Sequence, residues 1–125
     1  MSDRRVSGWV FWILLLIHGF ASLPLCVLLA AFVPRFAELF GRLWERGELP
    51  PLTQCVLLLS NYWGWLFLFG FALDATILHV LSRLPRRPWL FTLAWFGAAL
   101  VAIVALLYLT VWALLLPVQE MPATV

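Results

Sequence analysis

The stretch VPRFAELFGRLWERGELPPLT, residues 33–53, is the long polar connection between two apolar runs of the chain. Its apolar residues recur at i, i+3, i+4, i+7 and i+8, which places them on one face of a helix opposite the charged side chains. Pro34 suits the first turn of such a helix and Gly47 suits its C-terminal cap. The spacing predicts a short amphipathic helix over about 34–46. Its apolar face consists of Phe36, Leu39, Phe40, Leu43 and Trp44.

An amphipathic helix between two apolar runs fits the membrane–water boundary, where its apolar face meets lipid and its charged face meets water. We therefore expect an interfacial helix that turns Phe36, Phe40, Leu43 and Trp44 toward lipid or a partner protein. The alternative is a solubilising connector with no preferred orientation.

Composition assigns the chain to the membrane. Of its 125 residues, 65% are apolar and 11% are charged, compared with roughly a quarter charged in a soluble domain. A water-soluble chain of this length has too little interior to bury such an excess. The composition predicts an all-α integral membrane protein, and the net charge of +2 implies no nucleic-acid partner.

Three apolar runs are long enough to cross a bilayer as helices, and together they form one membrane domain, residues 1–125. The predicted spans are about 10–33, 54–81 and 89–116. The first has 24 residues, which at about 1.5 Å each reach about 36 Å, more than the hydrocarbon thickness of about 30 Å. The second has 28 residues and would have to be strongly tilted.

Arginine placement predicts the topology. Arg4 and Arg5 precede the first span, and Arg83, Arg86 and Arg87 connect the second span to the third. Arginine-rich short loops stay in the cytoplasm. The N-terminus is therefore expected to be cytoplasmic and the C-terminus extracytoplasmic.

A series of residues in the first two apolar runs and their connection follows a recognisable order: Val33, Pro34, Arg35, Phe36, Phe40, Leu49, Pro50, Thr53, Ser60, Tyr62 and Trp63. This order resembles the membrane hairpin of the type II secretion system F family, the polytopic inner-membrane platform proteins of secretion systems and type IV pili. In that family the first span ends in a Val-Pro-Lys/Arg-Phe-x-x-hydrophobic-Phe element, followed by Leu-Pro-x-x-Thr and then Ser-x-x-hydrophobic. The resemblance covers residues 25–69.

The resemblance implies a scaffold ancestry and a location in the bacterial inner membrane. The family carries helical cytoplasmic domains before the first span and after the second, and these domains are thought to meet the assembly ATPase. This chain has seven residues before its first apolar run and a seven-residue connection after its second. We therefore expect a truncated F-like protein that keeps the membrane hairpin.

His18, Asp74 and His79 are the ionisable side chains within the predicted spans. Each is costly in hydrocarbon unless it is paired or faces a polar cavity. Counted at about 1.5 Å per residue, His18 and Asp74 both lie about 10–12 Å from the cytoplasmic ends of their spans, whereas His79 lies about 3 Å deep. Depth thus permits a His18–Asp74 hydrogen bond between the first and second spans; the other possibility for Asp74 is contact with an adjacent subunit.

No nucleophile–base pair, phosphate-binding loop or metal-spaced cluster occurs in the sequence, so no enzymatic activity is expected. The first hypothesis is a non-catalytic assembly subunit that packs against other integral membrane proteins and lipids, with no cofactor. The alternative is an electron-transfer or light-harvesting subunit in which His18 or His79 binds haem or chlorophyll. The unequal depths of the two histidines make them poor axial ligands of one haem.

Overall fold

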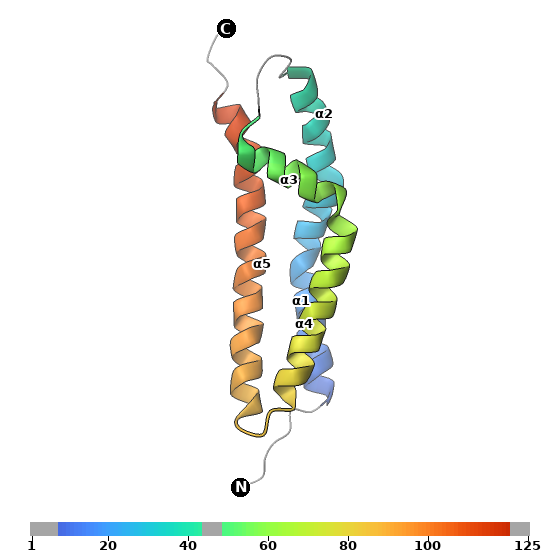
Figure 1. Cartoon of the computed structure of the whole chain (residues 1–125), viewed down its shortest axis with the longest axis vertical. Coiled ribbons are helices and arrows are strands. Elements are labelled where there is room, and N and C mark those ends of the chain that lie inside the picture. The colour runs from blue at the N-terminus through green and yellow to red at the C-terminus, as the bar shows by residue number, and fades with distance from the viewer. Residues whose placement is uncertain (1–7, 44–48, 121–125) are drawn as a thin grey trace.

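A computed structural model of the chain describes residues 8–43 and 49–120, and within these ranges every regular element is a helix. Three of the helices are long and apolar enough to cross a membrane, which confirms the expected all-helical, multi-pass membrane class. The elements are α1 (Gly8–Val27), the π-helix η1 (Leu28–Phe32), α2 (Val33–Leu43), α3 (Pro51–Asn61), α4 (Trp63–Ser82) and α5 (Pro88–Gln119) (Figure 1).

The first helix does not end at Pro34 but continues past it. The sequence predicted a span ending at Val33 and a separate interfacial helix after it, but α2 continues the helix of α1 through η1. The Val33 N–H bonds to the Leu28 carbonyl, five residues back. This wider turn lies directly before Pro34, whose ring would crowd the carbonyl four residues earlier in an ordinary α-helix. A position of this segment flat on the membrane surface is therefore not confirmed.

The predicted second span is divided. Tyr62 leaves the helical conformation, with φ −113° and ψ 15°, and separates α3 from α4. The turn tightens just before it, because the Tyr62 N–H bonds to the Leu59 carbonyl and the Ser60 hydroxyl bonds to the Leu57 carbonyl. The remaining 20 residues of α4 reach about 30 Å, which matches a bilayer core without tilt. Figure 1 shows α3 crossing the bundle at the end nearer the C-terminus.

The third span agrees with the sequence more closely, since α5 contains the whole predicted range 89–116. Helices α1, α4 and α5 contact one another pairwise and run side by side. The start of α1 and the α4–α5 connection lie at one end of the bundle, and α2 and the end of α5 lie at the other (Figure 1). We call these the proximal end and the distal end.

Two apolar clusters hold the bundle together. The proximal cluster joins α1, α4 and α5, and its buried members are Leu14, Leu15 and Leu78. The distal cluster joins α2, α3 and α5, and its buried members are Val33, Val56, Ala113 and Leu114. Because α3 crosses the bundle before α4 begins at Trp63, it covers the distal cluster on the side that α4 does not reach.

Exposed tryptophan and tyrosine side chains occur near two levels of the bundle. Trp9, Trp12 and Trp89 lie near the proximal end, and Trp63 and Tyr108 lie farther along α4 and α5. The 19 residues between Trp89 and Tyr108 correspond to about 28 Å of helix. Tryptophan and tyrosine gather at both boundaries of a bilayer, and the spacing matches a hydrocarbon core.

Candidate functional site

The structure brings together the two ionisable side chains that the sequence paired by depth. His18 lies on α1 with 3% of its side chain exposed, and Asp74 lies on α4 with 14% exposed. The His18 Nδ1 is 2.5 Å from the Asp74 Oδ2. The pair therefore links the first helix to the fourth in the proximal half of the bundle.

Helix α5 completes this polar group with two consecutive residues. The Trp95 indole Nε1–H donates to the Asp74 Oδ1 at 2.8 Å, and the His18 Nε2 lies 3.1 Å from the Phe96 carbonyl oxygen. The Phe96 ring also stacks on the imidazole, with centroids 4.7 Å apart and planes 13° from parallel. We call His18, Asp74, Trp95 and Phe96 the polar unit.

Sequence reasoning missed the two α5 members. A signal for Trp95 was present, because it lies seven residues from the start of α5, about 10 Å deep, near the level of Asp74. A buried indole N–H needs an acceptor, and Asp74 is the acidic residue at that depth. The Phe96 carbonyl had no such signal, since every residue carries one and its partner is set by how the helices pack.

The hydrogen bonds fix the proton count of the polar unit. The Phe96 carbonyl only accepts, so His18 Nε2 must carry a hydrogen. One further proton lies between His18 Nδ1 and Asp74 Oδ2, on the nitrogen of an imidazolium facing a carboxylate or on the oxygen of a carboxylic acid facing a neutral imidazole. Both arrangements have no net charge, which suits a site enclosed by apolar side chains.

The surroundings of the polar unit are apolar. Leu14, Leu15 and Leu78 are buried beside it, and the Phe11 and Phe71 rings pack on the same cluster. Among the described residues, every buried side-chain nitrogen or oxygen has a hydrogen-bond partner. The polar unit is thus internally complete, and its hydrogen bonds connect three helices that apolar contacts alone would leave free to slide.

His79 is outside the polar unit. It is exposed on α4, five residues nearer the proximal end than Asp74, and its ring meets the edge of Phe11 at a centroid distance of 6.0 Å. The structure therefore does not bring the two histidines together, and both ring nitrogens of His18 already have protein partners. Within residues 8–43 and 49–120, no cluster of three or more His, Cys, Asp or Glu side chains is arranged to hold a metal.

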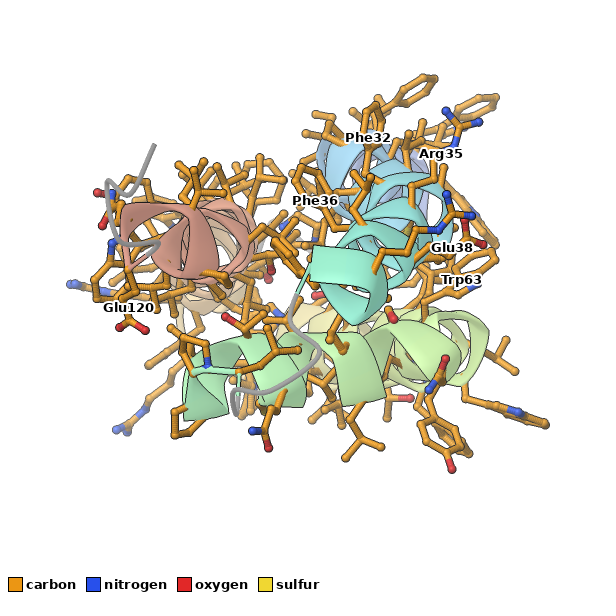
Figure 2. All side chains as sticks on the ribbon, turned by 90° about the horizontal axis from the view of Figure 1, so that it is seen from above. Phe32, Arg35, Phe36, Glu38, Trp63 and Glu120 are labelled. Atoms are coloured by element: carbon orange, nitrogen blue, oxygen red, sulfur yellow. The ribbon has the colours of Figure 1, made fainter. Side chains whose placement is uncertain are left out.

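The structure describes two of the four side chains predicted to face lipid or a partner protein, those of Phe36 and Phe40. Phe40 is only 3% exposed, and Phe36 packs on the distal cluster. Figure 2 shows Phe36 directed from α2 toward α5, while Arg35 and Glu38 lie on the outer side. The distal cluster covers Phe36, and the Phe40 ring lies beside the Phe36 ring at a centroid distance of 5.7 Å. The Leu43 side chain and Trp44 lie outside the described part.

A proline explains how α3 is held against α5. Pro117 has no N–H, so the carbonyl of Ala113, four residues earlier, lacks its usual helical donor. The Thr53 hydroxyl donates to this same carbonyl at 2.5 Å, and the Thr53 side chain and Ala113 are fully buried. The resemblance to the F family includes Thr53, and the structure gives this residue a definite role in packing.

Comparison with known proteins gives no match: the chain matches no protein-family model, no curated protein and no solved structure. The resemblance to the F family therefore rests on the order and spacing of the residues quoted above.

Proposed function

We propose that this protein is a non-catalytic structural subunit that assembles with other integral membrane proteins. The observation that carries the proposal is the complete internal pairing of the polar unit. Both nitrogens of His18 and both carboxylate oxygens of Asp74 are bonded to groups of this chain. The strongest polar chemistry in the described spans thus serves helix packing, and contact with other molecules is left to the outer surface.

The outer surface of α4 is the broadest candidate for such contact. Residues 61–70 are exposed without interruption, and Leu78 is the one fully buried residue of the helix. Trp65 and Phe69 lie one turn apart on this surface and stack with a centroid distance of 6.0 Å. Stacked aromatic rings present a large, rigid apolar area of the kind that anchors protein interfaces.

The F-like scaffold is part of this proposal, and the distal cluster supports it. Val33 and Phe36 of the resemblance pack in that cluster, and Thr53 and Ser60 of α3 are buried next to it. These four residues of the resemblance thus lie where the end of the first helix, the crossing helix α3 and α5 pack together. The proposed role is that of a membrane scaffold in the bacterial inner membrane.

Purification in mild detergent tests the proposal. We expect wild-type protein to co-purify with other integral membrane proteins, and we expect a Trp65→Ala/Phe69→Ala variant to recover less of them while its thermal unfolding stays unchanged. The matched control is Trp95→Phe, which alters the interior and should keep the partners. Equal recovery with all three proteins would refute a role for the α4 surface.

An absorption spectrum of the same preparation tests the cofactor alternative. Haem or chlorophyll binding at His18 would require one ring nitrogen to leave Asp74 or Phe96. A haem or chlorophyll band that disappears in His18→Ala would overturn the purely structural proposal. A preparation without such a band that retains its membrane partners would support it.

We further propose that the proximal end is cytoplasmic, because it carries Arg83, Arg86 and Arg87. Labelling of single cysteines measures this after Cys26 and Cys55 are replaced by serine. Probes at positions 2 and 84 should both react from the cytoplasmic side only. Reaction from opposite sides would contradict the three-span topology.

A further inference from the structure

The connection between α4 and α5 concentrates positive charge at the proximal end. Arg83, Arg86 and Arg87 are all exposed. Among described acidic residues, Glu38 and Glu120 lie at the distal end, and Asp74 belongs to the polar unit. No described carboxylate pairs with any of the three arginines. Within residues 8–43 and 49–120, the three guanidinium groups thus face no carboxylate that could neutralise them.

The connection is held in place at both sides. Leu84 is half-buried and Pro88 is buried, so the segment between them is anchored to the bundle. Backbone hydrogen bonds close the turn, from the Arg83 N–H to the Val80 carbonyl and from the Leu90 N–H to the Arg87 carbonyl, both at 3.1 Å. The arginines project from a fixed turn, which lowers the entropy lost when they bind a ligand.

The backbone gives no reason for an arginine at position 87. Arg87 has φ 47° and ψ 52°, and it is the one non-glycine residue of the described part with a positive φ. Glycine and asparagine adopt this left-handed conformation with less strain. Glycine or asparagine would fit this turn with less strain than arginine. The presence of arginine here is therefore better explained by a function of its guanidinium group.

The depth of the connection identifies the source of the anion. Trp9, Trp12 and Trp89 are exposed at the same end, and tryptophan side chains prefer the level of lipid headgroups. The arginines, which lie just beyond these rings along the bundle, are therefore at the level of lipid phosphates. Guanidinium groups bind phosphate oxygens through paired, charge-assisted hydrogen bonds.

We infer that Arg83, Arg86 and Arg87 form a binding site for the phosphate of an anionic phospholipid in the leaflet at the proximal end. Inorganic phosphate offers the same oxygen atoms. The three exposed tryptophans, however, place the site at the level where lipid phosphates are concentrated. The inference does not depend on which proteins the chain assembles with.

Lipid retention measured by native mass spectrometry tests the site. The protein is purified in detergent and mixed with equal amounts of phosphatidylglycerol and phosphatidylcholine. Wild-type protein should retain phosphatidylglycerol preferentially. A variant with all three arginines replaced by glutamine should bind it about a hundredfold more weakly, since each basic residue near an anionic membrane surface contributes about fivefold.

The matched control is Arg35→Gln/Arg42→Gln, which removes positive charge from exposed positions at the distal end. This variant should retain phosphatidylglycerol like the wild type. Equal loss in the two variants, or equal retention of the two lipids by wild-type protein, would overturn the inference. Displacement of the lipid by millimolar inorganic phosphate would also overturn it in favour of a site for free anions.

Arg87→Asn separates binding from folding, because asparagine tolerates the left-handed conformation but has no charge. We expect its thermal unfolding midpoint in neutral detergent to be equal to or higher than that of the wild type, while phosphatidylglycerol binding falls about fivefold. A fall in both quantities would show that Arg87 acts in folding and would contradict the assignment.

Discussion

The contact between Thr53 and Ala113 makes a sharp prediction about how α3 is attached to α5. Replacing Thr53 by valine keeps the shape of the side chain and removes the hydroxyl that donates to the Ala113 carbonyl. Pro117 supplies no N–H to that carbonyl, so the oxygen would be left without a partner in a buried position. The substitution therefore isolates one hydrogen bond without creating a cavity.

The expected loss follows from the burial of both groups. A buried acceptor without a partner costs about 1–3 kcal/mol, and Thr53 and Ala113 are both 0% exposed, so we expect about 2 kcal/mol. Pro117→Ala restores an N–H four residues after Ala113. In that background the carbonyl keeps an intrahelical donor, and Thr53→Val should cost less than about 1 kcal/mol.

The two substitutions form a double-mutant cycle with a coupling of about 1–2 kcal/mol. The assay is the free energy of unfolding measured by titrating sodium dodecyl sulfate into mixed micelles. Thr110→Val is the matched control, because the Thr110 hydroxyl bonds to the Leu106 carbonyl within its own helix, and that carbonyl also accepts the Thr110 N–H. The control should cost less than Thr53→Val. An equal cost of Thr53→Val in both backgrounds would refute the proposed role of Pro117.

Three further predictions concern the polar unit and the distal cluster, all read from the same titration. Asp74→Asn keeps the shape of the side chain but removes the carboxylate that faces His18, so it should lower stability by about 1–3 kcal/mol; an unchanged stability would show that the pair does not hold the helices together. Trp95→Phe removes a single N–H donor to Asp74 Oδ1 and leaves the contact between Asp74 Oδ2 and His18, so a loss of about 1 kcal/mol is expected. A loss larger than that of Asp74→Asn would contradict the central place of the carboxylate. Phe40→Asp buries a charge at a 3% exposed position and should lower the free energy of unfolding by several kcal/mol. Glu38→Lys on the outer side of α2 should change it by less than about 0.5 kcal/mol. Similar effects of the two substitutions would mean that α2 has no inner face.

Composition and depth were enough to predict the membrane class and one contact. The excess of apolar residues requires hydrocarbon around the helices, whatever their packing. The depth of His18 and Asp74 follows from helix rise and the ends of two apolar runs, so their pairing was within reach of the sequence. The start of α5 was also predictable from Pro88, whereas the helix continues through Pro117 to Gln119, three residues beyond the predicted end of the span.

Helix ends and faces in the distal half depended on packing that local patterns do not contain. Pro34 and the amphipathic pattern after it are typical of a new interfacial helix, yet a π-turn lets the helix continue. Phe36 and Phe40 have the spacing of a membrane-facing surface, yet Phe36 packs on the distal cluster and Phe40 is buried. Whether such a side chain is buried or faces the membrane depends on its neighbours in other parts of the bundle and not on the pattern of its own helix.

The sequence by itself determined the number of spans and which ionisable residues must find partners, because the cost of exposing a polar group to hydrocarbon is the same in any arrangement of helices. Only the tertiary structure decided which groups serve as those hydrogen-bond partners. The Phe96 carbonyl meets His18, and the Ala113 carbonyl meets Thr53, through helices separated by more than 50 residues of chain. Such contacts form between backbone groups that every residue carries, so only the relative position of the helices selects one carbonyl over the next.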